Sequence, residues 1–312
     1  MEKFLVTGGA GFIGSNICKK LISEGCFVRV LDNLLTGKKS NLADIDDKIE
    51  FIEADMGDSE VARSAMKDID IVLHQGALPS VPLSVDNPAA THRHCVDATF
   101  TLLLAARDVG VKRFVYAASS SAYGDAPVSP KVETMPTCPL SPYAVAKLVG
   151  EYYSSVFSKV FGLETISLRY FNVFGPYQDP TSQYAAAIPA FVTAILKDQS
   201  PTVYGDGEQS RDFTYIDNVV HANLLAARAQ ETGGEVINIA CGQAITVNAI
   251  IDMINKVVGK EVKPIYADSR PGDVKHSLAD INKAQTLIGF NPVVSFSEGL
   301  QKAIEWYRDN LL

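Results

Sequence analysis

The first half of the chain alternates short apolar runs with segments in which apolar residues recur every three or four positions. The apolar runs are typical of strands buried on both faces, and they cover residues 4–7, 27–31, 49–53, 69–74, 113–118 and 163–170. Segments with helical spacing lie between them and include residues 12–22, 60–65 and 99–109. This alternation predicts an α/β protein in which helices cover both faces of a doubly wound parallel sheet.

After Gly175 the alternation weakens, because a turn with Gly205 and Gly207 and several prolines interrupt it. These prolines are Pro176, Pro180, Pro189 and Pro201. One more core strand is expected at 235–240 and helices at 246–258 and 296–310. We therefore expect a Rossmann-type core with a smaller C-terminal substrate-binding lobe. The expected limits are 1–176 for the core, joined by about 211–242, and 177–210 with 243–312 for the lobe.

Composition and charge narrow the class of protein. The 312 residues are 47% hydrophobic and 21% charged, as in ordinary globular proteins. The formal net charge of −8 gives no electrostatic reason to bind nucleic acid or an anionic membrane. No apolar run approaches the ~18 residues of a membrane span, and no signal-peptide pattern precedes the first strand. The five cysteines form no C-x-x-C pair, which suits a reducing compartment. A cytoplasmic protein is expected.

A glycine-rich loop separates the first predicted strand from the first predicted helix. It reads Thr7-Gly-Gly-Ala-Gly-Phe-Ile-Gly14. Glycines at this spacing let the backbone turn tightly and approach a diphosphate at the helix N-terminus. Asp32 ends the next strand, where its carboxylate would accept hydrogen bonds from ribose hydroxyls and repel a 2′-phosphate. Asn33 follows, with no arginine to bind such a phosphate, so NAD is favoured over NADP as cofactor. The alternatives are a merely tight turn and a solvated Asp32.

A tyrosine and a lysine carry the candidate chemistry. Tyr143 and Lys147 stand four residues apart, on one face of a predicted helix that Pro142 would begin. A lysine ammonium beside a tyrosine favours the phenolate and lowers the tyrosine pKa, which makes a proton acceptor near neutral pH. A serine triplet, 119–121, ends a predicted core strand, where such sheets bind their ligands. A tyrosine and a lysine at this spacing also occur by chance on ordinary helix surfaces.

With these motifs the sequence resembles the extended short-chain dehydrogenase/reductase family, and within it the UDP-hexose 4-epimerases. The resemblance covers essentially the whole chain. Besides the glycine loop, its carriers are Asp55, Ala117-Ala-Ser-Ser-Ser-Ala-Tyr-Gly124, residues 141–147, Leu168-Arg-Tyr-Phe-Asn-Val-Phe-Gly-Pro176, Tyr204-Gly-Asp-Gly207, Arg211-Asp-Phe213, residues 215–218 and Arg270-Pro-Gly-Asp273.

The resemblance implies roles for individual residues. The catalytic serine of the family stands four residues before the tyrosine of the Tyr-Gly pair, which indicates Ser119, although its neighbours Ser120 and Ser121 leave the choice open by one or two positions. With Ser119, the implied catalytic residues are Tyr143 and Lys147. The implied cofactor contacts are Gly8, Gly11, Phe12, Ile13, Gly14, Asp32, Asn33, Gly37, Asp55, Met56, Gln75, Ala77, Tyr143, Lys147 and Tyr170.

The resemblance also implies a UDP-sugar site. Its residues are Ser120, Ser121, Asn172, Tyr204, Arg211, Arg270, Asp273 and Ser277. Arg211 and Arg270 would bind the diphosphate, because a guanidinium matches phosphate bidentately. From the residues alone, Arg211 could instead pair with Asp212 or Asp217, Tyr204 could belong to the core and Asp273 to a turn.

Ser277 bears on the choice of sugar. Epimerases restricted to non-acetylated sugars resemble one another in carrying a tyrosine at this position, whereas a serine leaves room for a 2-acetamido group. Here and in its serine triplet, the sequence is similar to the subgroup that prefers N-acetylhexosamines, such as UDP-N-acetylglucosamine 4-epimerases. The alternative is a small residue without consequence for specificity.

Two segments depart from the family pattern, at three positions. The family usually has His-x-Ala-Ala where this chain has His74-Gln-Gly-Ala77, and Asn-Val-x-Gly-Thr where it has Cys95-Val-Asp-Ala-Thr99. Both segments are expected near the cofactor, so its packing there is in question. His92 and His94 would not share a helix face, and no cysteine or acidic partner stands at ligand spacing, so no metal site is expected.

The resemblance implies reversible C4 epimerisation of UDP-hexoses with resident NAD, most of all UDP-GlcNAc/UDP-GalNAc and also UDP-Glc/UDP-Gal, in a homodimer. One alternative is an epimerase or decarboxylase of UDP-hexuronic or UDP-N-acetylhexosaminuronic acids, which would need a basic residue for the C6 carboxylate. Candidates for it are Arg93, Lys275 and His276. Another alternative is a non-catalytic nucleotide-binding scaffold, against which the intact Ser119, Tyr143 and Lys147 argue.

Overall fold

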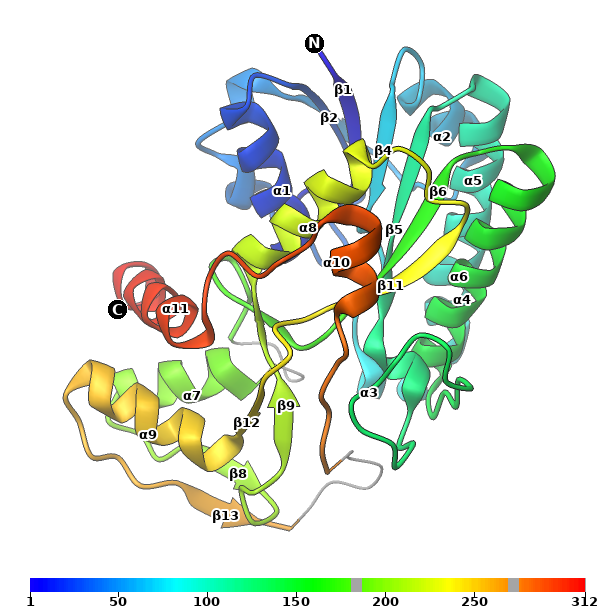
Figure 1. The fold of residues 1–312 in the computed structure, drawn as a ribbon. Helices are drawn as coiled ribbons and strands as arrows, with labels where there is room; N and C mark the ends of the chain where they lie inside the picture. The colour runs from blue at the N-terminus through cyan, green and yellow to red at the C-terminus, as the bar shows by residue number, and fades with distance from the viewer. Residues whose placement is uncertain (181–186, 269–274, 312) are drawn as a thin grey trace.

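Parallel strands form the centre of the computed structural model, which describes residues 1–180, 187–268 and 275–311 (Figure 1). A seven-stranded sheet of the described chain has the order β11-β6-β5-β4-β1-β2-β3, and all neighbouring strands are parallel. Its strands are β1 (Lys3–Thr7), β2 (Phe27–Asp32), β3 (Glu50–Glu53), β4 (Ile71–His74), β5 (Arg113–Ser119), β6 (Thr165–Tyr170) and β11 (Glu235–Ile239). The order reverses between β1 and β4, where a crevice forms at the carboxyl ends of the strands.

Helices cover both faces of this sheet, because its strands are apolar on both sides. One face carries α2 (Ser59–Ala65), α3 (Val81–Asp86), α4 (Pro88–His92), α5 (Ala98–Val109) and α6 (Pro142–Phe161) (Figure 1). The other carries α1 (Phe12–Ser23), α8 (Ile216–Arg228) and α10 (Asn282–Ile288) (Figure 1). Short 3-10 turns lie at Lys39–Leu42, Asp46–Lys48 and Ser120–Tyr123, and a π-helical turn at Arg93–Asp97 joins α4 to α5.

A smaller lobe adjoins the carboxyl ends of the sheet (Figure 1). Its strands pair as short ribbons: β8 (Thr202–Tyr204) with β13 (Ile265–Ala267), and β9 (Ser210–Asp212) with β12 (Ala244–Thr246). Packed together beside them are α7 (Ala187–Leu196), α9 (Val247–Val258) and α11 (Phe296–Leu311). The pair β7 (Val173–Phe174) and β10 (Thr214–Tyr215) links this lobe to the core.

The strands and helices expected from periodicity are all present, with ends shifted by one or two residues. The pattern did not predict α3, α4, α7, α8 or α10. Pro189, expected as an interruption, is the third residue of α7, where its missing N–H costs no intrahelical hydrogen bond. The limits of the two lobes stay a prediction, and α10, expected in the lobe, packs against β11 and α8 of the core. No described helix combines the length and the apolarity needed to cross a membrane.

Candidate active site

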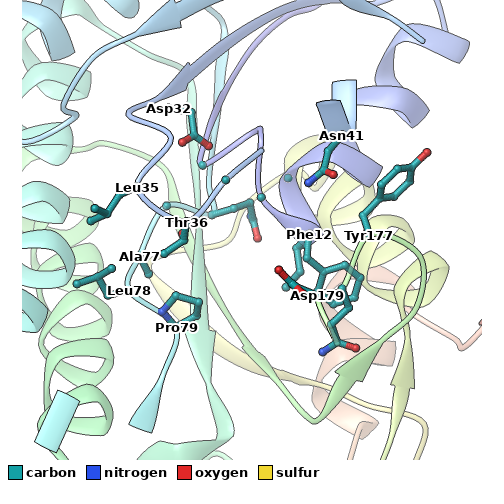
Figure 2. Close-up of a pocket in the computed structure, with 18 of the residues that line it drawn as sticks. Phe12, Asp32, Leu35, Thr36, Asn41, Ala77, Leu78, Pro79, Tyr177 and Asp179 are labelled. Carbon is teal, nitrogen blue, oxygen red and sulfur yellow. The ribbon is translucent and has the colours of Figure 1, made fainter. Parts of the chain in front are cut away.

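A cavity of about 1050 Å³ opens along the carboxyl ends of the parallel strands. Figure 2 shows Leu78 and Pro79 on one side of it and Tyr177 and Asp179 on the other. Residues that end or follow the central strands line its floor, among them Gly8, Asp32, Gln75, Ser119 and Tyr170. The cavity is therefore built where an open α/β sheet binds its ligand.

The glycine loop brings the first turn of α1 against the end of β1. A Cβ on Gly14 would lie 2.2 Å from the Gly8 carbonyl oxygen, so only glycine permits this approach. Gly8 has φ +67 and lies equally close to Gly76, since a Cβ on it would be 2.6 Å from the Gly76 Cα. No side chain caps α1 and its first turn has no acidic residue. The uncapped N–H groups beside Gly11 and Phe12, which line the cavity, fit the diphosphate of NAD.

Asp32 stands in the same cavity with its carboxylate held by two backbone N–H groups. Oδ2 accepts from Ala10 at 2.9 Å and Oδ1 from Leu34 at 2.8 Å. Burial raises the pKa of this carboxyl, and the two hydrogen bonds act against that rise. A Cβ on Gly37 would lie 3.0 Å from Oδ2, so the loop packs closely over the acid. Each carboxylate oxygen keeps a lone pair for a ribose hydroxyl.

Most of the cofactor contacts implied by the resemblance line this cavity. They are Gly8, Gly11, Phe12, Ile13, Gly14, Asp32, Asn33, Gly37, Met56, Gln75, Ala77, Tyr143 and Tyr170. Asp55 is not among the lining residues. Its Oδ1 accepts from the Gly57 N–H at 2.8 Å, and its Oδ2 lies 3.8 Å from Arg93. Lys147 is buried behind the wall and is not a lining residue either.

The first departure from the family pattern is filled by a neighbouring side chain. A Cβ on Gly76 would lie 2.6 Å from the Met56 Sδ and from its Cε. The space of the alanine methyl that the family usually has is therefore taken by Met56, which also lines the cavity. The flexible thioether suits such a gap.

The second departure lies in the π-helical turn. Cys95, which stands where the family usually has asparagine, is buried, and its carbonyl accepts from the Thr99 hydroxyl at 2.6 Å. Thr99 Oγ1 also lies 2.9 Å from His74 Nε2, and Thr7 Oγ1 lies 2.7 Å from His74 Nδ1. Burial lowers the pKa of His74 to about 3, so this chain of hydrogen bonds contains a neutral imidazole. It ties β1, β4 and α5 together beneath the cavity.

The expected catalytic residues come together from β5 and α6. Ser141 caps α6, accepting from the Ala144 N–H at 3.1 Å, and Pro142 occupies its first position, which places Tyr143 in the first turn. Tyr143 and Ser119 both line the cavity, and Ser119 is close enough to lower the pKa of the Tyr143 phenol. One turn further along α6, the Lys147 ammonium donates to the Ala117 carbonyl at 2.9 Å and lies 6.0 Å from the centre of the Tyr143 ring.

The prediction that Lys147 lowers the pKa of Tyr143 is wrong for this structure. Burial raises the pKa of the Tyr143 phenol, Cys95 adds to the rise, and only the hydrogen bond with Ser119 lowers it. Burial likewise lowers the pKa of Lys147, although Cys95 and Glu151 act in the other direction. The physical reason is that desolvation disfavours a phenolate and an ammonium alike.

Among the three serines, Ser119 alone is a lining residue. It caps the 3-10 turn that follows β5, and its Oγ accepts from the Ser121 N–H at 3.2 Å and from the Ser121 hydroxyl at 2.9 Å. Ser120 and Ser121 are half-buried in that turn and are not lining residues. The geometry therefore supports Ser119 as the serine beside Tyr143.

The implied substrate residues lie on separate elements. Asn172 lines the cavity, has a left-handed backbone (φ 28) and donates to the Asp212 carbonyl at 3.1 Å. Arg211, on β9, donates to the carbonyls of Ser210 and Lys275. The two acids that could have paired with Arg211 have other partners. Asp212 accepts from the N–H groups of Cys241, Gly242 and Ala279, and Asp217 lies 3.8 Å from Lys302.

Tyr204 and Ser277 lie at the edge of the lobe rather than on the cavity wall. Tyr204 ends β8 and is 38% exposed, so it does not belong to the core. Ser277 is half-buried, and its N–H donates to the Ser210 carbonyl at 3.0 Å, beside Arg211. Arg270 and Asp273 lie outside the described residues. Among those that are described, no three His, Cys, Asp or Glu side chains could hold a metal ion.

Sequence reasoning missed the outer wall of the cavity. It consists of Leu35, Thr36, Lys38, Ser40 and Asn41 after β2, together with Tyr177, Gln178, Asp179, Pro180, Trp306 and Asn310. Lys38 pairs with Asp179 at 2.7 Å across this opening. Tyr177 has φ 70, and its ring packs tilted against Trp306 with 5.1 Å between ring centres. Of these residues, Tyr177 was the one that the sequence could have indicated, because it directly follows the Asn172–Pro176 motif.

Comparison with known proteins gives one family and full-length relatives. The model of the NAD dependent epimerase/dehydratase family matches residues 4–240. A UDP-glucose 4-epimerase of Mycolicibacterium smegmatis is 34% identical, with 98% of each chain covered. The solved UDP-N-acetylglucosamine 4-epimerase from Methanobrevibacter ruminantium M1, in complex with UDP-N-acetylmuramic acid, is 40% identical (TM-score 0.95, 99% of each chain covered). The UDP-glucose 4-epimerase from Thermotoga maritima, solved with UDP-glucose, is 38% identical (TM-score 0.95, 99% of this chain and 100% of that one).

Proposed function

We propose, from the premise that this chain belongs to the NAD dependent epimerase/dehydratase family, that it is a UDP-sugar 4-epimerase whose preferred substrates are UDP-GlcNAc and UDP-GalNAc. The main support for the proposal is that two sets of residues line one cavity. The glycine loop with Asp32 lies at one end, and Ser119 with Tyr143 lies on the wall beside it. This arrangement joins a site fitted to NAD with a proton acceptor for a sugar hydroxyl.

The proposed reaction assigns each residue a task. Tyr143 acts as the phenolate and takes the proton of the C4 hydroxyl, while Ser119 beside it orients that oxygen. NAD, when bound, supplies the acceptor and later the donor of the C4 hydride. The 4-keto sugar turns over and presents its other face, after which Tyr143 returns the proton. Because burial raises the pKa of Tyr143, the phenolate needs positive charge nearby, and the Lys147 ammonium, held by the Ala117 carbonyl, and the nicotinamide of bound NAD would supply it. No cofactor is consumed.

The preference for acetylated sugars rests on Ser277. Its small side chain lies on a segment hydrogen-bonded to β9, next to Arg211, which we propose to bind the diphosphate together with Arg270. Asn172, Ser120, Ser121, Tyr204 and Asp273 complete the proposed sugar-nucleotide site. A serine leaves more space there than the tyrosine of epimerases restricted to non-acetylated sugars.

The uronic acid alternative is less well supported. A C6 carboxylate would want a basic residue in the cavity. Arg93, Lys275 and His276 are all exposed, and none of them belongs to the described lining of the cavity. His276 Nδ1 lies 2.9 Å from Ser210 Oγ instead. A non-catalytic scaffold would have no need for the Ser119–Tyr143 pair.

We also propose that the enzyme is a homodimer formed through α6. This helix exposes a row of large apolar side chains at Tyr152 (59%), Val156 (47%), Val160 (66%) and Phe161 (48%). Such a row on the outside of a helix is typical of an interaction surface. We expect Val156→Glu to give monomers in light scattering. Val257→Glu, at an exposed valine of α9 (40%), should leave the dimer intact. A Val156→Glu dimer would contradict this proposal.

The deciding experiment incubates the purified enzyme with a panel of UDP-sugars and no added NAD. We expect UDP-GlcNAc and UDP-GalNAc to interconvert fastest, UDP-Glc and UDP-Gal more slowly, and UDP-glucuronic acid to stay unchanged. The epimer ratio is read by NMR, and the cofactor is identified after denaturation. Bound NADP in place of NAD, or turnover of the uronic acid alone, would overturn the proposal.

A further inference from the structure

Three polar side chains form a closed hydrogen-bonded ring behind the cavity. Gln75 follows β4, Tyr170 ends β6, and Asn223 lies on α8. Gln75 Nε2 donates to Asn223 Oδ1 at 3.1 Å, Asn223 Nδ2 donates to the Tyr170 hydroxyl at 2.8 Å, and that hydroxyl donates to Gln75 Oε1 at 3.0 Å. Gln75 and Tyr170 line the cavity, whereas Asn223 is fully buried and does not.

A backbone carbonyl sets the direction of the ring. Asn223 Nδ2 also donates to the Val219 carbonyl at 2.8 Å, one helical turn earlier. Because a carbonyl can only accept, the NH₂ group of Asn223 must face Val219, and its Oδ1 must therefore face Gln75. This in turn requires the NH₂ group of Gln75 to face Asn223. The Oε1 of Gln75 then needs a donor, which the Tyr170 hydroxyl provides.

The ring determines which hydrogen-bonding groups of Gln75 and Tyr170 remain available to a ligand in the cavity. The Tyr170 hydroxyl has two acceptors within the ring, because it lies 3.0 Å from Gln75 Oε1 and 3.2 Å from Asn223 Oδ1. Burial raises the pKa of Tyr170, so this phenol keeps its proton. Gln75 Nε2 has two N–H bonds, and within the described chain one of them is used, by Asn223. Because Gln75 lines the cavity, we infer that the second N–H is available to a ligand there.

We propose that Asn223 is a positioning residue for the cofactor. It acts through Gln75, whose remaining N–H it holds ready for an oxygen acceptor of the bound dinucleotide. The inference rests on the proposed NAD-dependent function. It assigns a task to Asn223, a buried residue of α8 that lies outside the motif at residues 215–218.

The test measures how fast the purified holoenzyme releases NAD, with alcohol dehydrogenase and ethanol converting released NAD into NADH for detection. Asn223→Leu keeps the branching and the number of heavy atoms of the side chain but removes both polar groups. We expect release to become about tenfold faster, which corresponds to ~1.4 kcal/mol, the net worth of about one hydrogen bond. Gln75→Met should have a similar effect. The double variant should release NAD no faster than the faster single variant, because both changes break one contact.

Asn218→Leu is the matched control. Asn218 is another fully buried asparagine of α8, and its partners among the described residues are backbone groups of Val293 and Val294 and the Cys241 thiol. We expect it to lower the melting temperature without changing NAD release. If it accelerates release as much as Asn223→Leu does, the effect belongs to α8 as a whole and the inference fails.

Other outcomes also decide the matter. The positioning role would be overturned if Asn223→Leu released NAD at the parental rate. It would also be overturned if the effects of the two single variants multiplied in the double variant. If Asn223→Leu does not fold, Tyr170→Phe breaks the ring at its third member. This variant should release NAD about threefold faster than the parent. An unchanged rate of release would overturn the inference. A parent enzyme purified without NAD would contradict the proposed function itself and not this inference alone.

Discussion

The cofactor end and the substrate end of the proposed site are built in different ways. At the cofactor end, the backbone does most of the work. Gly8 and Gly14 allow approaches that a single Cβ would block, and Asp32 is held in place by two N–H groups. These groups come from the first βαβ unit and lie within a short stretch of sequence.

At the proposed substrate end, the residues that we assign to binding are side chains from distant segments. Asn172 follows β6, Arg211 lies on the short strand β9, and Ser277 lies more than sixty residues further along the chain. Tyr204 is partly exposed, and the ribbons that carry these residues have two strands each. Recognition by backbone shape is therefore local in sequence and tolerates little change, whereas recognition by side chains is assembled in three dimensions and can be retuned one residue at a time.

The largest effect on turnover is expected at Tyr143, which lies between the cofactor end and the substrate end of the proposed site. Tyr143→Phe removes the proton acceptor but keeps the ring, so turnover should fall by about 10²–10⁴-fold while NAD stays bound. Tyr153→Phe, at a 36% exposed tyrosine of the same helix that is not in the proposed dimer surface, is the control and should be fully active. Steady-state rates and NAD content check this. Activity of Tyr143→Phe within about threefold of the parent would remove Tyr143 from the mechanism.

Gly14→Ala tests the intolerance of the cofactor end. The new Cβ would lie 2.2 Å from the Gly8 carbonyl oxygen, so the loop must shift. Overpacking typically costs about 1–3 kcal/mol, so NAD affinity should fall roughly 10- to 100-fold. Gly57→Ala, where a Cβ would meet its closest neighbour at 3.2 Å outside the cavity, should bind NAD nearly as the parent does. Equal NAD contents for parent and Gly14→Ala would show that the close approach is not required.

Ser277→Tyr tests whether a single side chain at the proposed substrate end can change the specificity for the sugar. If Ser277 lies beside C2 of the sugar, the added ring occupies the space of the acetamido group, at a cost of about 1–3 kcal/mol, or one to two decades. The quantity to measure is the ratio of kcat/KM for UDP-GlcNAc over UDP-Glc, which should fall by that factor. Ser297→Tyr, at an exposed serine of α11, should leave the ratio unchanged. An equal loss on both substrates would indicate damage to the lobe rather than a change in specificity.

The smallest effect is expected where the two lobes meet across the opening of the cavity. Lys38 and Asp179 are both solvent-accessible, and exposed ion pairs contribute about 0.2–1 kcal/mol. Lys38→Met should therefore speed NAD release by less than about fivefold, and salt should remove the difference from the parent. Lys39→Met is the control, because Lys39 does not line the cavity. A tenfold or larger effect that persists in high salt would mean that Lys38 binds the cofactor directly.

The sequence by itself determined the parallel core, the cofactor end and the identity of the Tyr143–Lys147 pair. Each depends on interactions between near neighbours: apolar runs of strand length, glycines before a helix, and two residues one helical turn apart. The same local logic explains the error over the pKa of Tyr143. Spacing along α6 places a lysine nearby, but it does not report that both groups are buried.

Only the tertiary structure decided what depends on distant contacts. Met56 fills the gap left at Gly76. Tyr177, Asp179 and Trp306 close the outer wall of the cavity. Asn223 reaches Gln75 over 148 residues of chain. None of these residues carries a motif, because their roles arise from strand order and helix packing. A sequence pattern records which residues follow one another, whereas a hydrogen bond between segments depends on how the whole chain is folded.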